Sequence, residues 1–166
     1  MKTLLRITLI LSVALATACA TSRQAAEKED TTKQNVERQL DQRNYRINVG
    51  YMIPRRGIGR AVSGPYSLSV NGEAIDSHLP YFGVVQSTPY GGGKALSFQD
   101  QIDEYSDEGW VKGKRTITLS TDNGEDTLTY TLTIYDNGQA VIRVKGNNRD
   151  EIAYRGVLND ISAPEE

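Results

Sequence analysis

The residue types that most often carry chemistry are scarce in this chain. Its 166 residues include one cysteine, one histidine, one tryptophan and two phenylalanines. The single cysteine has no internal disulfide partner. One cysteine and one histidine together are too few to supply the three or four ligands of a zinc site. No serine lies in the G-x-S-x-G pattern that could pair with His78. We therefore expect no metal, no cofactor and no Ser-His-Asp catalysis.

A strong charge of either sign is also lacking. The chain carries 19 basic and 21 acidic residues, a net charge of −2. Binding to nucleic acid requires a basic surface that this balance does not provide. We expect no nucleic-acid partner.

A long apolar run occurs only at the N-terminus. An apolar stretch ends at Ala18; Lys2 precedes this stretch and Arg6 lies within it. This arrangement is typical of a signal peptide (residues 1–18) and is short for a membrane span. Small residues directly before Cys19 resemble a bacterial lipoprotein box, in which cleavage exposes the cysteine for attachment of acyl chains such as palmitate. The alternative is an ordinary cysteine within a plain signal peptide.

The rest of the chain divides into three parts by composition. Residues 19–34 contain no large apolar side chain and predict a flexible tether. A single β-rich domain is expected over residues 35–160, followed by a frayed tail at 161–166. A helix is expected over about 31–43, because Val36 and Leu40 are four residues apart on one face.

Alternation of apolar and polar residues dominates from Tyr45 onward. In the first such segment the predicted buried face is Tyr45, Ile47, Val49, Tyr51 and Ile53. Similar alternation recurs at 66–70, 117–119, 128–134, 140–144 and 152–158, and Asn71-Gly72 predicts a tight hairpin. Residues 103–109 are polar without this pattern. The sequence predicts a mainly β protein, an antiparallel small barrel or sandwich of seven to nine strands with one N-terminal helix.

The stretch from Leu79 to Phe98 combines two apolar arms with a loop rich in proline and glycine. Its LPYFG, PYGGG and LSF segments resemble the DUF4251 family of Bacteroidetes envelope proteins. Similar segments are Pro65–Leu68, Asn137-Gly138 with Val141–Val144, and Ile152–Gly156. The resemblance covers about residues 35–160 and implies an exported β-rich domain. It carries over no catalytic or binding residue.

Two groups of side chains are candidates for binding. Aromatic residues near the central loop could line a pocket for a small apolar or sugar ligand, or could simply fill the core. This group is Tyr81, Phe82, Tyr90, Phe98 and Trp110. Arg55, Arg56 and Arg60 could contact an anion, or could belong to a solvated loop.

Carboxylates are plentiful, but their spacing selects no catalytic pair. One group is Asp100, Asp103, Glu104, Asp107 and Glu108, and a second is Asp122, Glu125 and Asp126. Neither matches the spacing of a calcium loop. Solvated loop charge is the simpler interpretation of both groups.

These observations favour a non-catalytic binding or accessory module anchored to the membrane through acylated Cys19. It would hold a small ligand or an envelope protein partner. Because no acidic run follows Cys19 directly, we expect an outer-membrane lipoprotein facing the periplasm. One alternative is an envelope glycan hydrolase with a carboxylate pair. Another is a purely structural envelope protein.

Overall fold

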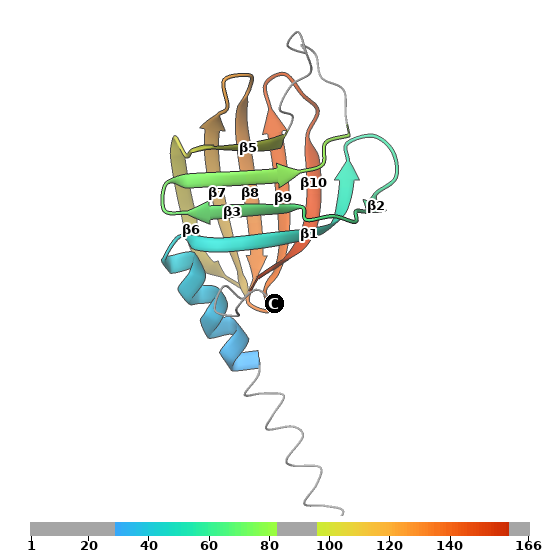
Figure 1. Ribbon diagram of the computed structural model, residues 1–166. Coiled ribbons are helices and arrows are strands. Elements are labelled where there is room, and N and C mark those ends of the chain that lie inside the picture. The colour runs from blue at the N-terminus through green and yellow to red at the C-terminus, as the bar shows by residue number, and fades with distance from the viewer. Residues whose placement is uncertain (1–28, 83–95, 160–166) are drawn as a thin grey trace, which may run out of the picture.

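A computed structural model describes residues 29–82 and 96–159 of the chain, and these form one curled antiparallel sheet (Figure 1). The strand order is β5-β4-β3-β1-β10-β9-β8-β7-β6, with the short β2 paired to β1. The strands are β1 (Asn44–Pro54), β2 (Arg60–Ala61), β3 (Ser67–Asn71), β4 (Ala74–Leu79), β5 (Leu96–Gln101), β6 (Glu104–Val111), β7 (Lys114–Asp122), β8 (Thr127–Tyr135), β9 (Gln139–Gly146) and β10 (Ile152–Leu158). The expected mainly β, antiparallel fold with one N-terminal helix is confirmed.

The sheet curls so that its two end strands approach each other. In Figure 1, β1, β3, β4 and β5 cross in front of β7 to β10. The backbone N–H of Asp103 donates to the carbonyl of Ser120 at 2.9 Å, and the Thr121 hydroxyl donates to the carbonyl of Gln101 at 2.8 Å. These bonds tie the β5–β6 connection to β7. The result is a half-barrel whose apolar face lies inside.

Tyrosine fills much of this interior, as the scarcity of phenylalanine predicts. Tyr45, Tyr130 and Tyr154 are almost fully buried. The Tyr130 hydroxyl donates to Ser77 Oγ at 3.1 Å, and the Tyr154 hydroxyl donates to the carbonyl of Pro80 at 2.7 Å. Burial raises the pKa of Tyr130 and of Tyr154 far above the ordinary value. Both hydroxyls therefore stay protonated and bridge opposite sides of the core.

The predicted buried face of the first strand is wrong after Val49. A β-bulge between Val49 and Tyr51 shifts the register against β10. Met52 is consequently buried, whereas Tyr51 points outward and Ile53 is only half-buried. A bulge adds one residue and reverses the faces that follow it. This reversal places an aromatic ring on the outer surface.

Two further local features differ from the sequence-based expectation. The hairpin at Asn71 forms, but Asn71 itself pairs with Ala74, so Gly72 and Glu73 make the two-residue turn. Gly72 has φ of +62°, a conformation that glycine adopts without strain. The polar stretch 103–109 was expected to lack a strand, yet most of it forms the edge strand β6. Charged side chains and a bulge are common on such edges because they discourage pairing with another chain.

The N-terminal helix occupies residues 29–41, two residues earlier at each end than expected. It takes in residues 29–34, which the sequence placed in the tether. Val36 and Leu40 are buried as predicted. A side chain added at Gly138, in the β8–β9 turn, would contact Val36 at 3.8 Å. The helix therefore closes one end of the half-barrel (Figure 1).

Arg115 on β7 clamps the helix to the sheet. Its guanidinium lies 2.6 Å from Asp41 of the helix and 2.6 Å from Asp107 of β6. Burial opposes ionisation of Asp107, but hydrogen bonds from Arg115 and from the Gly109 N–H outweigh it, and the pKa of Asp107 is lowered. The clamp thus favours the ionised form of Asp107.

We expect Arg115→Met to lose about 2 kcal/mol of unfolding free energy at neutral pH, because hydrogen bonds to charged groups are worth about that much. Since the folded pKa of Asp107 is depressed, its contribution is present above the unfolded pKa near 4 and lost as pH falls through the folded pKa. Urea titrations at pH 7 and pH 3 should show the variant and the wild type converging at acid pH. Arg143→Met, at an exposed pair 3.9 Å from Glu151, is the matched control and should change little. If the unfolding free energies of Arg115→Met and the wild type differ as much at pH 3 as at pH 7, this account is contradicted.

Candidate functional site: a groove on the outer face

Two large hollows lie on the outer side of the curled sheet. One open groove of about 770 Å³ runs over β1, β9 and β10. Its lining is mainly apolar. It includes Tyr51, Tyr135, Val141 and Val157.

Two glycines form the floor of this groove. Gly50 is the residue at the bulge of β1, and a Cβ added there would meet no atom within 4 Å. Gly156 pairs with Val49, and a Cβ there would collide with the carbonyl oxygen of Asn48. The backbone of β10 therefore approaches β1 too closely for any side chain. Gly50 leaves the floor bare on the outer side. Gly156 lines the groove with its backbone, because a side chain there would face the core like its partners Val49 and Ala140.

Exposed hydrophobic side chains gather around this floor. Tyr51, Tyr135 and Val157 are 37%, 39% and 55% exposed. They are three of the six large hydrophobic side chains that are exposed in the described chain, the others being Ile58, Phe82 and Val111. Single exposed hydrophobic residues need no explanation, but their clustering in a hollow is typical of a binding surface.

A basic hollow of about 780 Å³ continues the groove toward the β9–β10 connection, and the two share Val141 and Arg155. Its cationic side chains include Arg55, Arg143, Lys145 and Arg155, against the carboxylates Asp150 and Glu151. The ion pairs here are long, 3.4 Å for Arg55–Asp150 and 3.9 Å for Arg143–Glu151. Lys145 and Arg155 make no ion pair with the described residues. The hollow therefore has an excess of positive charge, and we call the two hollows together the outer groove.

Strand pairing sets the order of side chains along the outer groove. Arg155 of β10 lies opposite Tyr51 on one side and Val141 on the other. Because side chains two apart on a strand share a face, Val141, Arg143 and Lys145 all point outward from β9. Aromatic, aliphatic and basic groups thus follow each other along one surface.

A buried ion pair fixes the connection at the basic end. Arg149 Nε donates to Asp126 Oδ2 at 2.8 Å, and the side chains are 5% and 1% exposed. Asp126 Oδ1 also accepts from the backbone N–H groups of Asn147 and Asn148, at 2.9 and 3.2 Å. The pair joins the β7–β8 and β9–β10 connections. It holds in place the segment that carries Asp150.

Residues 25–158 of the chain match DUF4251, a domain of unknown function. The chain belongs to the DUF4251 family. The resemblance drawn from the sequence is therefore confirmed.

The crystal structure of a DUF4251 family protein from Bacteroides eggerthii DSM 20697 has the same fold. Its TM-score is 0.60 at 14% sequence identity, over 78% of this chain and 88% of that chain. No curated protein matches this DUF4251 chain. In its described residues no helix is both long and apolar enough to cross a membrane.

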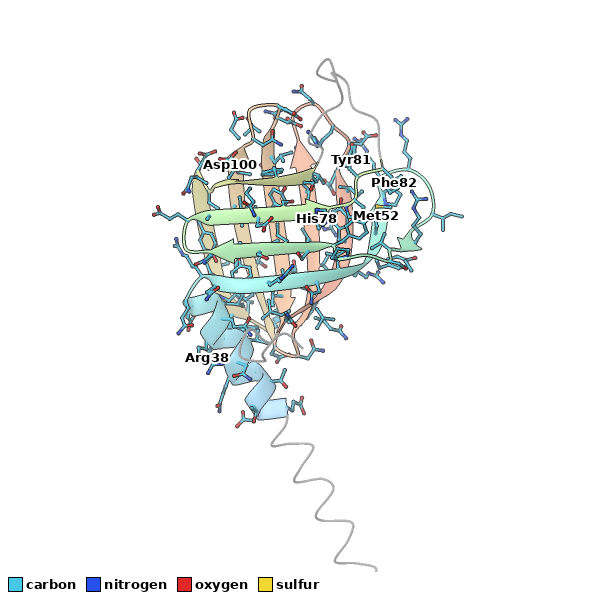
Figure 2. The ribbon with its side chains drawn as sticks, in the orientation of Figure 1. Arg38, Met52, His78, Tyr81, Phe82 and Asp100 are labelled. Atoms are coloured by element: carbon cyan, nitrogen blue, oxygen red, sulfur yellow. The ribbon has the colours of Figure 1, made fainter. Side chains whose placement is uncertain are left out.

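The aromatic residues proposed for a pocket are not brought together in this DUF4251 domain. Phe98 is buried in the core, and Trp110 lies on β6 opposite Arg115, near the helix. Tyr81 and Phe82 follow β4, far from the helix residue Arg38 in Figure 2. Tyr90 lies outside the described residues. The group spans the core and two separate surfaces.

Tyr81 and Phe82 each meet an arginine. The Tyr81 hydroxyl donates to the carbonyl of Asp150 at 3.2 Å, and the Arg149 guanidinium lies 5.5 Å from its ring. Burial raises the pKa of Tyr81. Phe82 is 52% exposed, with the Arg60 guanidinium 3.9 Å above its ring. These contacts secure the end of β4.

The three arginines proposed for anion contact also separate. Arg55 lines the outer groove, Arg60 covers Phe82, and Arg56 is exposed. The groove's other cations come from β9 and β10 and are not among the residues predicted from the sequence. The available signal was their alternation with Val141 on a strand whose opposite face is buried.

The carboxylates and the histidine of this DUF4251 domain make structural contacts. Asp107 and Asp126 each accept hydrogen bonds from an arginine. Asp122 accepts the Gly124 N–H within its turn. His78 Nδ1 lies 2.8 Å from Ser97 Oγ across the β4–β5 pair. Among residues 29–82 and 96–159, no three His, Cys, Asp or Glu side chains are grouped to hold a metal.

Proposed function

We propose that this DUF4251 protein is a lipid-anchored, non-catalytic binding module of the cell envelope, and that the outer groove is its binding surface. The observation that carries the proposal is the clustering of Tyr51, Tyr135 and Val157 beside unpaired cations. Recognition sites combine apolar surface with a few placed polar groups.

The anchor follows from the sequence. Cys19 stands directly after the apolar run, ten positions before Glu29, the first described residue of the helix. Ten residues span at most about 35 Å when extended. Two or more acyl chains would hold the module firmly, since each buried CH₂ contributes about 0.8 kcal/mol. The periplasmic face of the outer membrane remains the proposed location.

Acylation predicts that cells fed radiolabelled palmitate incorporate label into the wild-type protein. Mass spectrometry of the mature N-terminus should give Cys19 with diacylglycerol and an N-acyl chain. Cys19→Ala should carry no label and should leave the membrane fraction. An unmodified Cys19 on the mature wild-type protein would remove the anchor from the proposal.

Binding at the outer groove can be tested in living cells without knowing the ligand. A photoreactive amino acid in place of Gln139, an exposed groove residue, should form a discrete adduct on irradiation. The same amino acid in place of Ser106, exposed on the edge strand β6, is the matched control and should form none. Adding Gly50→Trp should abolish the Gln139 adduct by filling the floor. Absence of an adduct at Gln139 would defeat the binding proposal and favour a purely structural role.

An envelope glycan hydrolase is not favoured by any described contact. Its general acid must be protonated in the resting enzyme, whereas hydrogen bonds from Arg115 and from the Gly109 N–H lower the pKa of Asp107. Asp126 is buried in its contact with Arg149 and is not open to a substrate. We therefore retain the binding module alone.

A further inference from the structure

We infer the class of ligand that the outer groove accepts, an inference that rests on the proposed function. The geometry points to an acidic, extended peptide segment of a partner protein. Its apolar side chain would lie over the Gly50–Gly156 floor, and its carboxylates would pair with Arg143, Lys145 and Arg155. Each part of this assignment follows from the lining of the groove.

Charge selects an acidic ligand. Four cations, Arg55, Arg143, Lys145 and Arg155, face two carboxylates in the basic hollow, although the whole chain is net negative. Guanidinium groups bind carboxylates through paired hydrogen bonds that are stronger than neutral ones. Arg155 also lies 6.0 Å from the Tyr51 ring, which positions it between the apolar and basic parts. A ligand with both apolar and acidic groups would satisfy both parts at once.

The apolar lining selects a peptide over a glycan. Tyr51, Tyr135 and Val157 stand around bare backbone, with Val141 between the two hollows. Tyrosine and arginine are the side chains most enriched at energetically dominant positions of protein interfaces. A sugar placed here would set its hydroxyls against valine side chains, and unpaired buried hydroxyls are costly. An aliphatic or aromatic side chain fits this surface without that cost.

The shape of the outer groove selects an extended chain over a lipid surface. It runs beside β9 from Gln139 to Lys145, six residue steps or about 20 Å. This matches about six residues of extended peptide. A bilayer is flat and would leave the hollow unfilled, and Asp150 and Glu151 at its border would repel lipid phosphates. The occupant is therefore a single projecting strand or loop.

The test is a selection of random twelve-residue peptides displayed on phage against the purified full-length protein in detergent. We expect enrichment of peptides with Asp or Glu beside an aromatic or large aliphatic residue. Synthetic versions should bind Gly50→Trp and the double variant Arg143→Glu, Arg155→Glu at least tenfold more weakly than wild type. Ser106→Trp and Ser106→Glu are the matched controls and should bind as wild type does. Circular dichroism checks each fold, with Gly50→Leu replacing Gly50→Trp if that variant does not fold.

Other results would overturn the inference. Selected peptides without acidic residues, or equal binding to the groove variants, would contradict it directly. Polygalacturonate and vesicles of phosphatidylglycerol are tested in parallel. If either binds in a manner that Gly50→Trp abolishes while acidic peptides do not bind, the peptide inference fails and the proposed binding function stands. If the protein with the photoreactive amino acid at position 139 also forms no adduct in cells, the peptide inference and the proposed binding function both fail.

Discussion

Gly156→Ala is expected to lose about 3 kcal/mol or more of unfolding free energy, among the larger losses known for one added methyl group. The new Cβ would collide with the carbonyl oxygen of Asn48 and would lie 3.0 Å from Ile47 Cγ2. Both neighbours belong to β1, and a backbone carbonyl within a paired strand cannot rotate aside. Relief requires β1 and β10 to separate, which breaks the ladder at the centre of the sheet. Urea denaturation followed by tyrosine fluorescence gives the change.

Gly50→Ala is the matched control for this prediction. Gly50 follows Val49, the residue that pairs with Gly156, and its backbone lines the same groove, but a Cβ there meets nothing within 4 Å. Its unfolding free energy should stay within about 0.5 kcal/mol of wild type, as for other unconstrained surface positions. Equal losses for the two variants would mean that close approach of the strands is not what keeps Gly156 small.

Asp126→Asn is expected to lose about 3–5 kcal/mol of unfolding free energy, because it removes the carboxylate of a buried ion pair while the guanidinium of Arg149 stays buried. The Arg149 guanidinium would remain 5% exposed without its carboxylate. An amide nitrogen could also face the backbone N–H groups of Asn147 and Asn148, which now donate to Asp126 Oδ1. Chemical denaturation at neutral pH measures the loss.

Two comparison variants separate charge burial from a general effect on turns. Asp122→Asn, in the same β7–β8 connection but exposed, should lose less than about 1 kcal/mol. Asp126→Asn combined with Arg149→Met should recover part of the lost unfolding free energy, since the buried guanidinium is then removed as well. A double variant that is less stable than Asp126→Asn alone would contradict the explanation.

Much of the fold could be predicted because one face of each strand is buried. Leu128, Tyr130, Leu132 and Ile134 alternate strictly with threonine, and all four are buried in β8. The strand β6 was missed because it is an edge strand with few buried side chains, so its sequence shows little alternation. Alternation of apolar and polar residues indicates a strand with one buried face, so it gives no signal for a strand with few buried side chains.

The bulge at Gly50 explains the main error in the first strand. Tyr51 and Ile53 continue the alternation of Tyr45 to Val49, and nothing in their apolar character marks the reversal. The glycine was the only local signal, because glycine inside a strand often marks a bulge. One inserted residue thus moved Tyr51 from the expected core to the outer groove.

The candidate site could not be predicted, because it depends on the strand order and the sequence does not give that order. The outer groove combines β1 with β9 and β10, and residues 51 and 155 become neighbours only because β1 pairs with β10. Aromatic residues close together in the sequence were the available cue instead. They separated because Phe98 is buried from β5, Trp110 lies on the edge strand β6, and Tyr81 and Phe82 follow β4. Of the three arginines proposed for anion contact, Arg55 alone lines the outer groove.

The central claim is that the outer groove is occupied in the envelope, and cysteine accessibility tests it most directly. Cys19 is the only cysteine in the chain, and an acylated thiol does not react with maleimide. Gln139→Cys and Ser106→Cys would each be labelled by a small membrane-permeant maleimide, in intact cells and after purification. The account predicts that Gln139→Cys reacts more slowly in cells than when purified, whereas Ser106→Cys reacts equally in both. Equal rates for Gln139→Cys in cells and in the purified protein would contradict it.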